Sequence, residues 1–306
     1  MLNQHLLEGA IALDSSFKLT YGSPQSLWHV AAQFDPRQSV VTRLYRQGNY
    51  AFICQLRHTS QERMATLSFF SGNGEIQGDF LSGILDDMRL CTQNTGAMHL
   101  VAEVDHKLPL LEGMKSWGFT VSAWQDIWKL NIPPYPPGSQ EPVAEWCPLA
   151  EVDWWQAVQL LQSIIPPISQ ATDLPLRHRS RFWVCHQAER IIAFADIRSG
   201  PQGIWIHPTF DPGVSRVSDL VSGLSNSLPA RLSRPLYLSI RSYQSWLFRS
   251  IELMNAEYIG HQAILVKHLA GHIKEPSAIE LLQLEKAKVK PSHPVVSSRS
   301  INRIMH

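Results

Sequence analysis

An aspartate and a histidine on two predicted strands have the residue types needed for proton transfer. Asp196 lies in a strand predicted over 190–197, and His207 ends the next strand, predicted over 203–207. Consecutive strands would place the carboxylate beside the imidazole, where both could flank a substrate amine. Histidine titrates near neutral pH and is the natural base for an amine, with Glu103 a weaker candidate. The sequence equally allows a solvent-facing Asp196 and a His207 that satisfies a local hydrogen bond.

A second polar group follows a later predicted strand. Arg241, Tyr243 and Gln244 stand where the strand predicted over 236–241 passes into a helix predicted over 244–254. Strand ends that open onto a helix gather polar side chains, so we expect a substrate pocket at this point. The alternative is that Tyr243 packs between two parts of the fold.

The sequence gives no indication of a metal site or a nucleophilic triad. The four cysteines are widely separated: Cys54, Cys91, Cys147 and Cys185. Their spacing argues against a zinc knuckle or a disulfide scaffold. His268 and His272 have the spacing of two helical ligands, but Gly271 interrupts the helix and no third ligand is near. A Walker sequence is absent, and no G-x-G-x-x-G follows a strand.

Composition excludes several classes of protein. The 306 residues include 27 Lys and Arg against 26 Asp and Glu, for a formal net charge of +1, and 44% are hydrophobic. Such a chain is neither a charged disordered polymer nor an obvious binder of nucleic acid. It lacks the ~18 consecutive apolar residues of a membrane span and the basic segment of a secretion signal. We therefore expect a cytoplasmic protein without nucleic-acid or membrane partners.

The chain divides at a proline-rich segment. Five prolines fall in the eleven residues 132–142, a run that favours a stiff extended connector. We expect one domain over 1–131, a second over 143–270, and a flexible, basic tail over 271–306. The sequence does not indicate an oligomeric state.

The two domains are predicted to repeat one order of elements. In the first, strands are expected over 49–58, 63–70, 99–104 and 123–130, with helices over 80–91 and 108–117. In the second, helices are expected over 152–165, 214–228 and 244–254, with strands over 182–187, 190–197, 203–207, 236–241 and 258–268. At an offset of about 137 residues a few identities survive: Leu110 and Leu247, Gln125 and Gln262, Ile127 and Ile264.

The chain resembles the GNAT acetyltransferase superfamily over about residues 40–130 and 145–269. The elements of that family follow the order helix, three strands, helix, strand, helix, strand. The stretches LVAEVDHKLPLLEGMKSWGFTVSAWQDIWKL and YLSIRSYQSWLFRSIELMNAEYIGHQAILVKHL both look like that family's last strand, helix, turn and strand. The segment IWIHPTFDPGVSRVSDLVSGL resembles the strand, loop and helix that hold acetyl-CoA. The resemblance implies an α/β fold of mixed sheets, with two GNAT-like domains in tandem.

The resemblance also implies a function, namely an acyl-CoA-dependent N-acyltransferase with acetyl-CoA as co-substrate, no metal, and an amine of a small molecule or peptide as acceptor. In the family, one strand splays from its neighbour and binds the pantetheine arm as an added strand, and the following loop binds the pyrophosphate. A histidine or carboxylate deprotonates the amine. In the second half these roles place catalysis on His207 or Asp196. Acetyl-CoA binding falls on Trp205, Ile206, Gly213, Val214, Ser215 and Arg216.

The chain departs from the family pattern at two sites. The glycine positions of the phosphate loop fall on Asp211, Val214 and Arg216, of which Arg216 could pair with phosphate directly. The position of the tyrosine that protonates the thiolate falls on Met114 in the first half and on Ile251 in the second, and neither side chain can donate a proton.

Two alternatives therefore stay open. The first is a binding or regulatory module that keeps the GNAT fold without acetyl transfer. The second is a transferase that takes a larger, aminoacyl-carrying donor through Arg241 and the basic cluster at 177–181.

Overall fold

The strands of both halves join in a single mixed sheet, which has 12 strands in the part of the chain that the structure describes. A computed structural model describes residues 7, 9–36, 38–59, 62–74, 78–131, 145–175, 179, 181–228 and 234–269. The connector predicted over 132–142 and the tail predicted over 271–306 lie outside these residues. No described helix is long and apolar enough to cross a membrane.

The first half begins with three short elements and a ten-residue strand over 38–47, none of which was predicted, and continues with the predicted order. Its strands are β1 (Ile11–Ala12), β2 (Gln38–Gln47), β3 (Tyr50–Thr59), β4 (Met64–Gly72), β5 (His99–Asp105) and β6 (Thr120–Leu130). Its helices are α2 (Ser15–Tyr21), α3 (Leu27–Ala32), α4 (Gly78–Asn94) and α5 (Leu110–Ser116).

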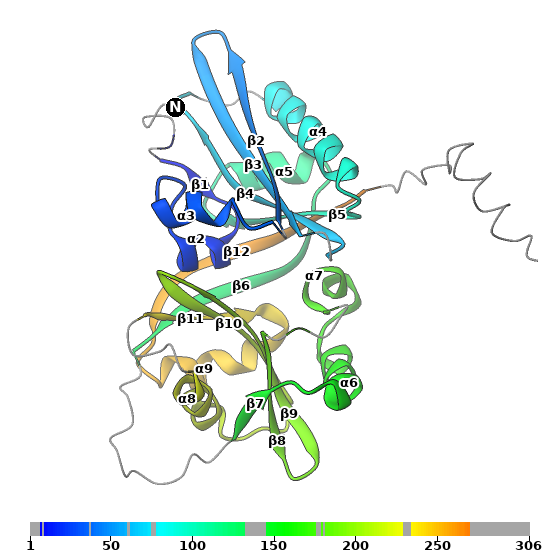
Figure 1. Ribbon diagram of the computed structural model, residues 1–306, viewed down its shortest axis with the longest axis vertical. Helices are drawn as coiled ribbons and strands as arrows, with labels where there is room; N and C mark the ends of the chain where they lie inside the picture. Colours follow the sequence, from blue (N-terminus) through cyan, green and yellow to red (C-terminus); the bar gives the residue numbers. More distant parts are fainter. Residues whose placement is uncertain are drawn as a thin grey trace, which may run out of the picture. The chain divides into compact units, whose positions relative to one another are not determined.

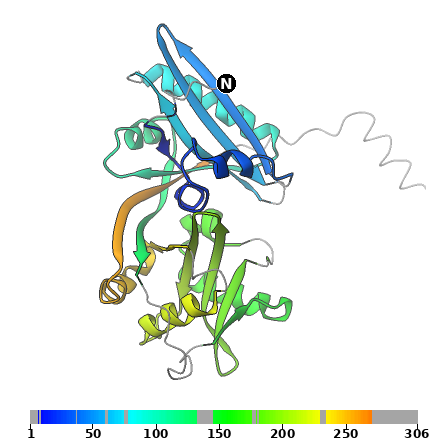
Figure 2. The same ribbon diagram turned by 60° about the vertical axis from the view of Figure 1, so that its left-hand side comes forward.

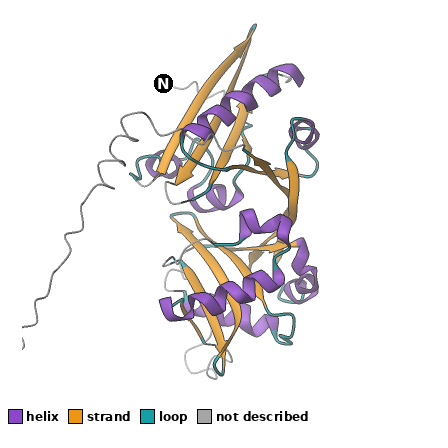
Figure 3. Cartoon of the chain, turned by 90° about the vertical axis from the view of Figure 1, so that its right-hand side faces the viewer, coloured by secondary structure: helices purple, strands orange, loops and turns teal. Residues whose placement is uncertain are grey.

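The second half repeats this order. Its strands are β7 (Trp146–Pro148), β8 (Phe182–Gln187), β9 (Arg190–Gly200), β10 (Gly203–Phe210), β11 (Leu236–Arg241) and β12 (Glu257–His268). Its helices are α6 (Trp154–Ile164), α7 (Gln170–Asp173), α8 (Val217–Ser227) and α9 (Phe248–Glu252), with 3-10 turns over Glu151–Asp153, Pro167–Ser169 and Ser242–Leu247. Figure 3 shows helices on the faces of the sheet in both halves. The predicted mixed α/β fold is confirmed.

The last strand of each half borders the other half. In the sheet order β2-β3-β4-β5-β12-β6-β11-β10-β9-β8-β7, β12 lies between β5 and β6, and β6 lies between β12 and β11. These contacts are antiparallel, and Figures 1 and 2 show β6 and β12 side by side. Gln125 stands opposite Gln262 in this central pair. Each half of the sheet is therefore completed by a strand from the other half.

The hydrophobic cores follow the same exchange of strands. Ala263 and Leu265 of β12 are buried in the core of the first half. Trp128 and Leu130 of β6 are buried in the core of the second half. Since apolar burial is the main source of folding free energy, each half draws part of its stability from the other.

We expect Leu265→Ala to destabilise both halves together. Leu265 is fully buried, and truncation of a buried leucine costs about 2–5 kcal/mol. Urea unfolding followed by tryptophan fluorescence and by far-UV circular dichroism should give one coincident transition, shifted to lower urea. Leu253→Ala, at a side chain that is 78% exposed, is the matched control. Two separate transitions would contradict the shared stability.

Helix α2 connects the N-terminal segment to the second half. Asp14 caps its first turn by accepting a hydrogen bond from the Phe17 N–H at 3.0 Å. The helix lies against β9 and β10. A Cβ on Gly200 would come within 2.4 Å of the Thr20 carbonyl oxygen, so only glycine lets the helix approach this closely.

Candidate active site

Two neighbouring strands of the second half diverge in the middle of the sheet. β10 and β11 pair in parallel over 204–206 and 236–238 only, whereas β10 stays paired with β9 as far as Phe210. The backbone of 207–210 therefore borders an opening towards β11. This is the splay that the family resemblance predicts for a thioester site.

The side chain of Gln244 fills this opening. Its Oε1 accepts a hydrogen bond from the Phe210 N–H at 3.0 Å, and its Nε2 donates to the Pro208 carbonyl at 3.0 Å. Gln244 is fully buried and interrupts the 3-10 turn before α9 with φ −120° and ψ 32°. One carboxamide thus satisfies the two backbone groups of β10 that face the opening.

The first half has the same divergence, but a backbone segment fills it. β4 and β5 pair in parallel over 64–66 and 99–101 only. The Leu13 N–H donates to the Ser68 carbonyl of β4 at 2.9 Å, and the Glu103 N–H of β5 donates to the Leu13 carbonyl at 2.8 Å. β1, just before Leu13, pairs antiparallel with β4. The N-terminal segment of the chain therefore lies between β4 and β5 as an added strand.

A cavity of about 300 Å³, the His207 cavity, lies beside the splay of the second half. Alternate side chains of β10 point into it, because successive residues of a strand face opposite sides. These are Trp205, His207 and Thr209. Ile206, on the other face, packs in the hydrophobic core with α8. The other walls come from both halves and include Glu103, Asp173, Asp196 and Arg241.

His207 is held as a neutral imidazole. Its Nδ1 lies 3.2 Å from the Ser239 carbonyl oxygen, which can only accept, so Nδ1 carries the proton and donates. Its Nε2 is buried and has no hydrogen-bond partner. Burial lowers the pKa of His207 to about 4, with a further contribution from the charge of Arg241. The residue therefore offers a lone pair on Nε2 at neutral pH.

Asp196 stands directly opposite His207 on β9, as the sequence predicts, but its charge is already neutralised. Arg181 contacts both carboxylate oxygens, at 2.6 and 3.0 Å, and Arg198 lies 3.5 Å away. Burial by itself would raise the pKa of Asp196, but the two arginines outweigh it and lower the pKa. The geometry favours His207 over Asp196 as a base.

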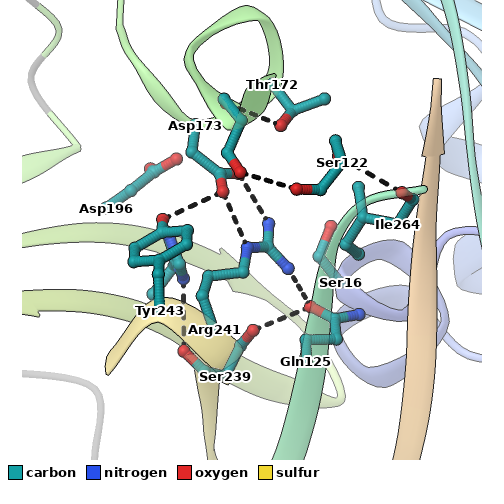
Figure 4. Close-up of polar contacts among 12 residues, drawn as sticks. Ser16, Ser122, Gln125, Thr172, Asp173, Asp196, Ser239, Arg241, Tyr243 and Ile264 are labelled. Atoms are coloured by element: carbon teal, nitrogen blue, oxygen red, sulfur yellow. Dashed lines mark hydrogen bonds and ion pairs between the residues drawn. The ribbon is translucent and has the colours of Figure 1, made fainter. Parts of the chain in front are cut away.

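The predicted substrate residues Arg241 and Tyr243 bind another acid of the protein. Arg241 donates Nε and Nη2 to the two oxygens of Asp173 at 3.0 and 2.9 Å, and the Tyr243 hydroxyl donates to Asp173 at 2.9 Å (Figure 4). The Asp173 side chain is only 1% exposed. Burial would raise its pKa, but Arg241 foremost and His207 lower it. This bidentate pair forms a wall of the cavity.

The network continues across the exchanged strands. Arg241 and Ser239 both donate to the side-chain oxygen Oε1 of Gln125, and the Gln125 Nε2 donates to the Gln262 Oε1 at 2.9 Å. Ser15 donates to the same Gln262 oxygen at 2.7 Å. Gln125 and Gln262, the polar pair among the identities noted between the repeats, thus contact each other across the two halves. Figure 4 shows Gln125 beside the Arg241 guanidinium.

Two backbone N–H groups of the predicted phosphate loop already donate hydrogen bonds within the loop. The Gly213 N–H donates to the Asp211 carboxylate at 2.8 Å, and the Val214 N–H donates to the Asp211 carbonyl at 3.0 Å. Arg216 pairs with Asp219 and is 65% exposed, and the neighbouring Ser215 is exposed. The structure does not bring these residues to the His207 cavity.

The predicted tyrosine position is apolar in both halves. Met114 and Ile251 are fully buried in the two hydrophobic cores, so neither takes part in proton transfer. Of the basic cluster 177–181, Arg179 and Arg181 are described and line the His207 cavity, while 177, 178 and 180 lie outside the described residues.

Sequence reasoning missed the N-terminal segment and Asp173. Asp14-Ser15-Ser16 is a helix-start signal that would have indicated α2. Asp173 lies in a four-residue helix, which is too short for a periodic pattern to reveal.

Comparisons with known proteins agree with the fold. No family model and no curated protein matches the chain. A functionally unknown conserved protein from Staphylococcus epidermidis matches with a TM-score of 0.50 and 9% identity, over 75% of this chain and 95% of that one. A GCN5-related N-acetyltransferase from Sphaerobacter thermophilus has a TM-score of 0.49 and 10% identity, over 85% and 95%.

A tandem GNAT protein from the clavulanic acid biosynthesis pathway has a TM-score of 0.45 and 10% identity, over 77% of this chain and 84% of that one. Identities this low concern the fold alone. The duplicated element order and the parallel splay in each half are the features of this chain's own structure that agree with its resemblance to the GNAT superfamily.

Proposed function

We propose that the second half is an acyl-CoA-dependent N-acyltransferase in which His207 is the base. The observation that carries this proposal is the position of one strand segment, 207–210. Its backbone borders the splay where the resemblance implies a pantetheine arm, and its His207 and Thr209 side chains line the cavity. A thioester in the splay would therefore lie next to an amine in the cavity.

Gln244 is proposed to hold the place of the thioester ligand. Its carboxamide offers an N–H donor and an oxygen acceptor, as each amide of pantetheine does, and it bonds the Pro208 carbonyl and the Phe210 N–H of the splayed strand. A side chain can rotate away from such a position, whereas the filler of the first half is the backbone around Leu13. The second half is therefore the half that we expect to bind acetyl-CoA.

The proposed reaction uses the lone pair of His207. The amine nitrogen attacks the thioester carbon, Nε2 takes the amine proton, and the C–N bond forms as the C–S bond breaks. Because the tyrosine position is the buried Ile251, the departing thiolate takes its proton from solvent. Arg241 and Asp173 would fix the cavity wall around the acceptor.

A specific observation favours the alternative, a GNAT-fold binding module without acetyl transfer. Several backbone groups that would hold acetyl-CoA are engaged within the chain: Gln244 bonds two groups in the splay, and Asp211 accepts from two N–H groups of the loop. If these contacts are permanent, acetyl-CoA has no place to bind.

Titration calorimetry with acetyl-CoA separates the two functions. Gln244→Ala frees the Pro208 and Phe210 groups, so we expect it to bind acetyl-CoA about three- to tenfold more tightly than the unmodified protein, the value of one or two net hydrogen bonds. Gln187→Ala, an exposed glutamine on β8, should leave the affinity unchanged. No heat at millimolar acetyl-CoA with either protein would contradict the transferase. Binding that Gln244→Ala leaves equal or weaker would contradict the role of Gln244.

A further inference from the structure

A second cavity adjoins the His207 cavity. It has a volume of about 590 Å³ and lies between α2, β3 and β9. We call it the arginine recess, because four guanidinium groups line it: Arg57, Arg179, Arg181 and Arg198. The last three of these, with Ser16 and Glu62, also line the His207 cavity. One ligand can therefore reach from the recess into the cavity along this shared wall.

Arg57 is fixed at the inner end of the recess. Its Nη1 donates to the Asp14 carboxylate at 3.2 Å, and its Nη2 donates to Gln38 at 2.9 Å. Its guanidinium lies 3.4 Å from the centroid of the Phe17 ring. These contacts leave Arg57 only 16% exposed, so we assign it a structural part in the wall.

Arg198 stands in the wall between the two cavities and has donors to spare. Its Nη1 donates to the Ser16 hydroxyl at 3.0 Å. Its nearest recorded carboxylate, Asp196, is 3.5 Å away and already holds Arg181 on both oxygens. The Arg198 side chain is 45% exposed, into the space that both cavities share. A guanidinium in such a position is suited to a carboxylate or a phosphate.

The His207 cavity is lined by a carboxylate, Glu103, that could bind a positively charged group of the ligand. Glu103 accepts a hydrogen bond from the Ser15 N–H at 2.7 Å through Oε2, and no arginine contact to it is recorded among the described residues. Burial raises the pKa of Glu103, with a further contribution from Asp14, and this outweighs the opposing charges of Arg241 and Arg198. An ammonium group beside Glu103 would relieve the cost of burying this carboxylate.

The charges around the recess nearly cancel. Its four arginines face three lining carboxylates, Asp14, Asp35 and Glu62. A further carboxylate, Asp196, lines the adjoining His207 cavity and pairs with Arg181. A lining with little net charge does not attract a polyanion, but it suits a small ligand that carries charges of both signs.

We infer that the two cavities together bind one small zwitterionic molecule, with its carboxylate or phosphate group on Arg198 and its amino group in the His207 cavity near Glu103. This inference deepens the proposed function. It rests on that function only where it makes the zwitterionic molecule the acyl acceptor. The binding itself requires no acyl transfer.

Calorimetry without acetyl-CoA tests the inference with four probes. γ-Aminobutyrate carries an amine and a carboxylate, O-phosphoethanolamine an amine and a phosphate, butylamine only the amine, and butyrate only the carboxylate. We expect γ-aminobutyrate, O-phosphoethanolamine or both to bind at least about tenfold more tightly than butylamine and butyrate. The tighter of the two zwitterions shows whether the site prefers a carboxylate or a phosphate. Equal affinity for butylamine and both zwitterions would overturn the inference.

Two variants locate the two charges. Arg198→Gln should weaken the zwitterion by about tenfold or more, the value of a charge-assisted hydrogen bond, and leave butylamine unchanged. Glu103→Gln should weaken the zwitterion and butylamine but not butyrate. Arg89→Gln, at a 32% exposed arginine of α4 paired with Asp86, is the control, and thermal unfolding checks that each variant folds. Loss of zwitterion binding in Arg89→Gln as large as in Arg198→Gln would overturn the assignment.

The outcome is independent of the acyl-transfer test. Zwitterion binding without acetyl-CoA binding would remove the proposed function and keep the binding site. Acetyl-CoA binding without zwitterion binding would remove the acceptor class and keep the transferase.

Discussion

Replacing His207 with alanine is expected to lower the turnover of acyl transfer by about 10²- to 10⁴-fold, the usual contribution of a positioned base. The binding of acetyl-CoA should change little, because the Pro208 and Phe210 groups that face the splay remain. Turnover is measured as free thiol released from acetyl-CoA with a zwitterionic amine as acceptor. Asp196→Asn should keep far more of the turnover, because Asp196 is engaged by Arg181 and not free to act as a base.

The pH dependence of stability gives an independent readout of His207. Its pKa of about 4 in the folded protein lies below the ordinary value of 6.5. Between these two values the unfolded chain binds a proton that the folded chain does not, so folding stability falls as the pH falls through this window. His207→Gln removes that contribution, and its stability relative to the unmodified protein should improve from pH 7 to pH 4.5. An unchanged difference, or full turnover in His207→Ala, would refute the assignment.

Replacing Arg241 with methionine is expected to destabilise the fold by about 3–5 kcal/mol, because it leaves a buried carboxylate without its cation. Asp173 is 1% exposed and receives two hydrogen bonds from Arg241. Urea unfolding measures the loss at pH 7. In the variant, burial raises the pKa of Asp173 without opposition from Arg241, so the carboxyl takes up a proton more readily and the loss should shrink as the pH falls.

A double variant and a surface control complete this test. Arg241→Met with Asp173→Asn has no buried charge at this position, so it should recover much of the lost stability. Arg190→Met removes an arginine that is 72% exposed and pairs with Asp211, and it should cost less than about 1 kcal/mol. If Arg241→Met cost as little as Arg190→Met, the network would not stabilise the junction of the halves.

Much of the fold could be predicted because its elements carry local patterns. Helix α4 places Ile84, Leu85 and Met88 on one buried face, and strand pairs such as β9 and β10 follow each other along the chain. The exchange of β6 and β12 has no local signal. Both strands have the same buried pattern whichever neighbour they pair with, so only the packing of the whole sheet decides the order.

The candidate site could be predicted in part, for the same reason. The position of Asp196 opposite His207 follows from two adjacent strands. Arg181 and Asp173 reach the site from outside those strands, and their pairing depends on three-dimensional packing that no spacing encodes. Gln125 and Gln262 were visible as a repeated identity, but an identity between repeats does not indicate that the two residues touch.

The exchanged closing strands bear on how this architecture can evolve. A gene fragment that encoded only the first half would supply β5 and β6 without the strand that joins them, and the second half alone would lack the neighbour of β11. Both products would expose unpaired strand edges, which invite aggregation. Once such an intertwined pair had arisen by duplication, loss of either half would prevent the other half from folding. The two halves must therefore be inherited together, even if only one of them keeps a catalytic site.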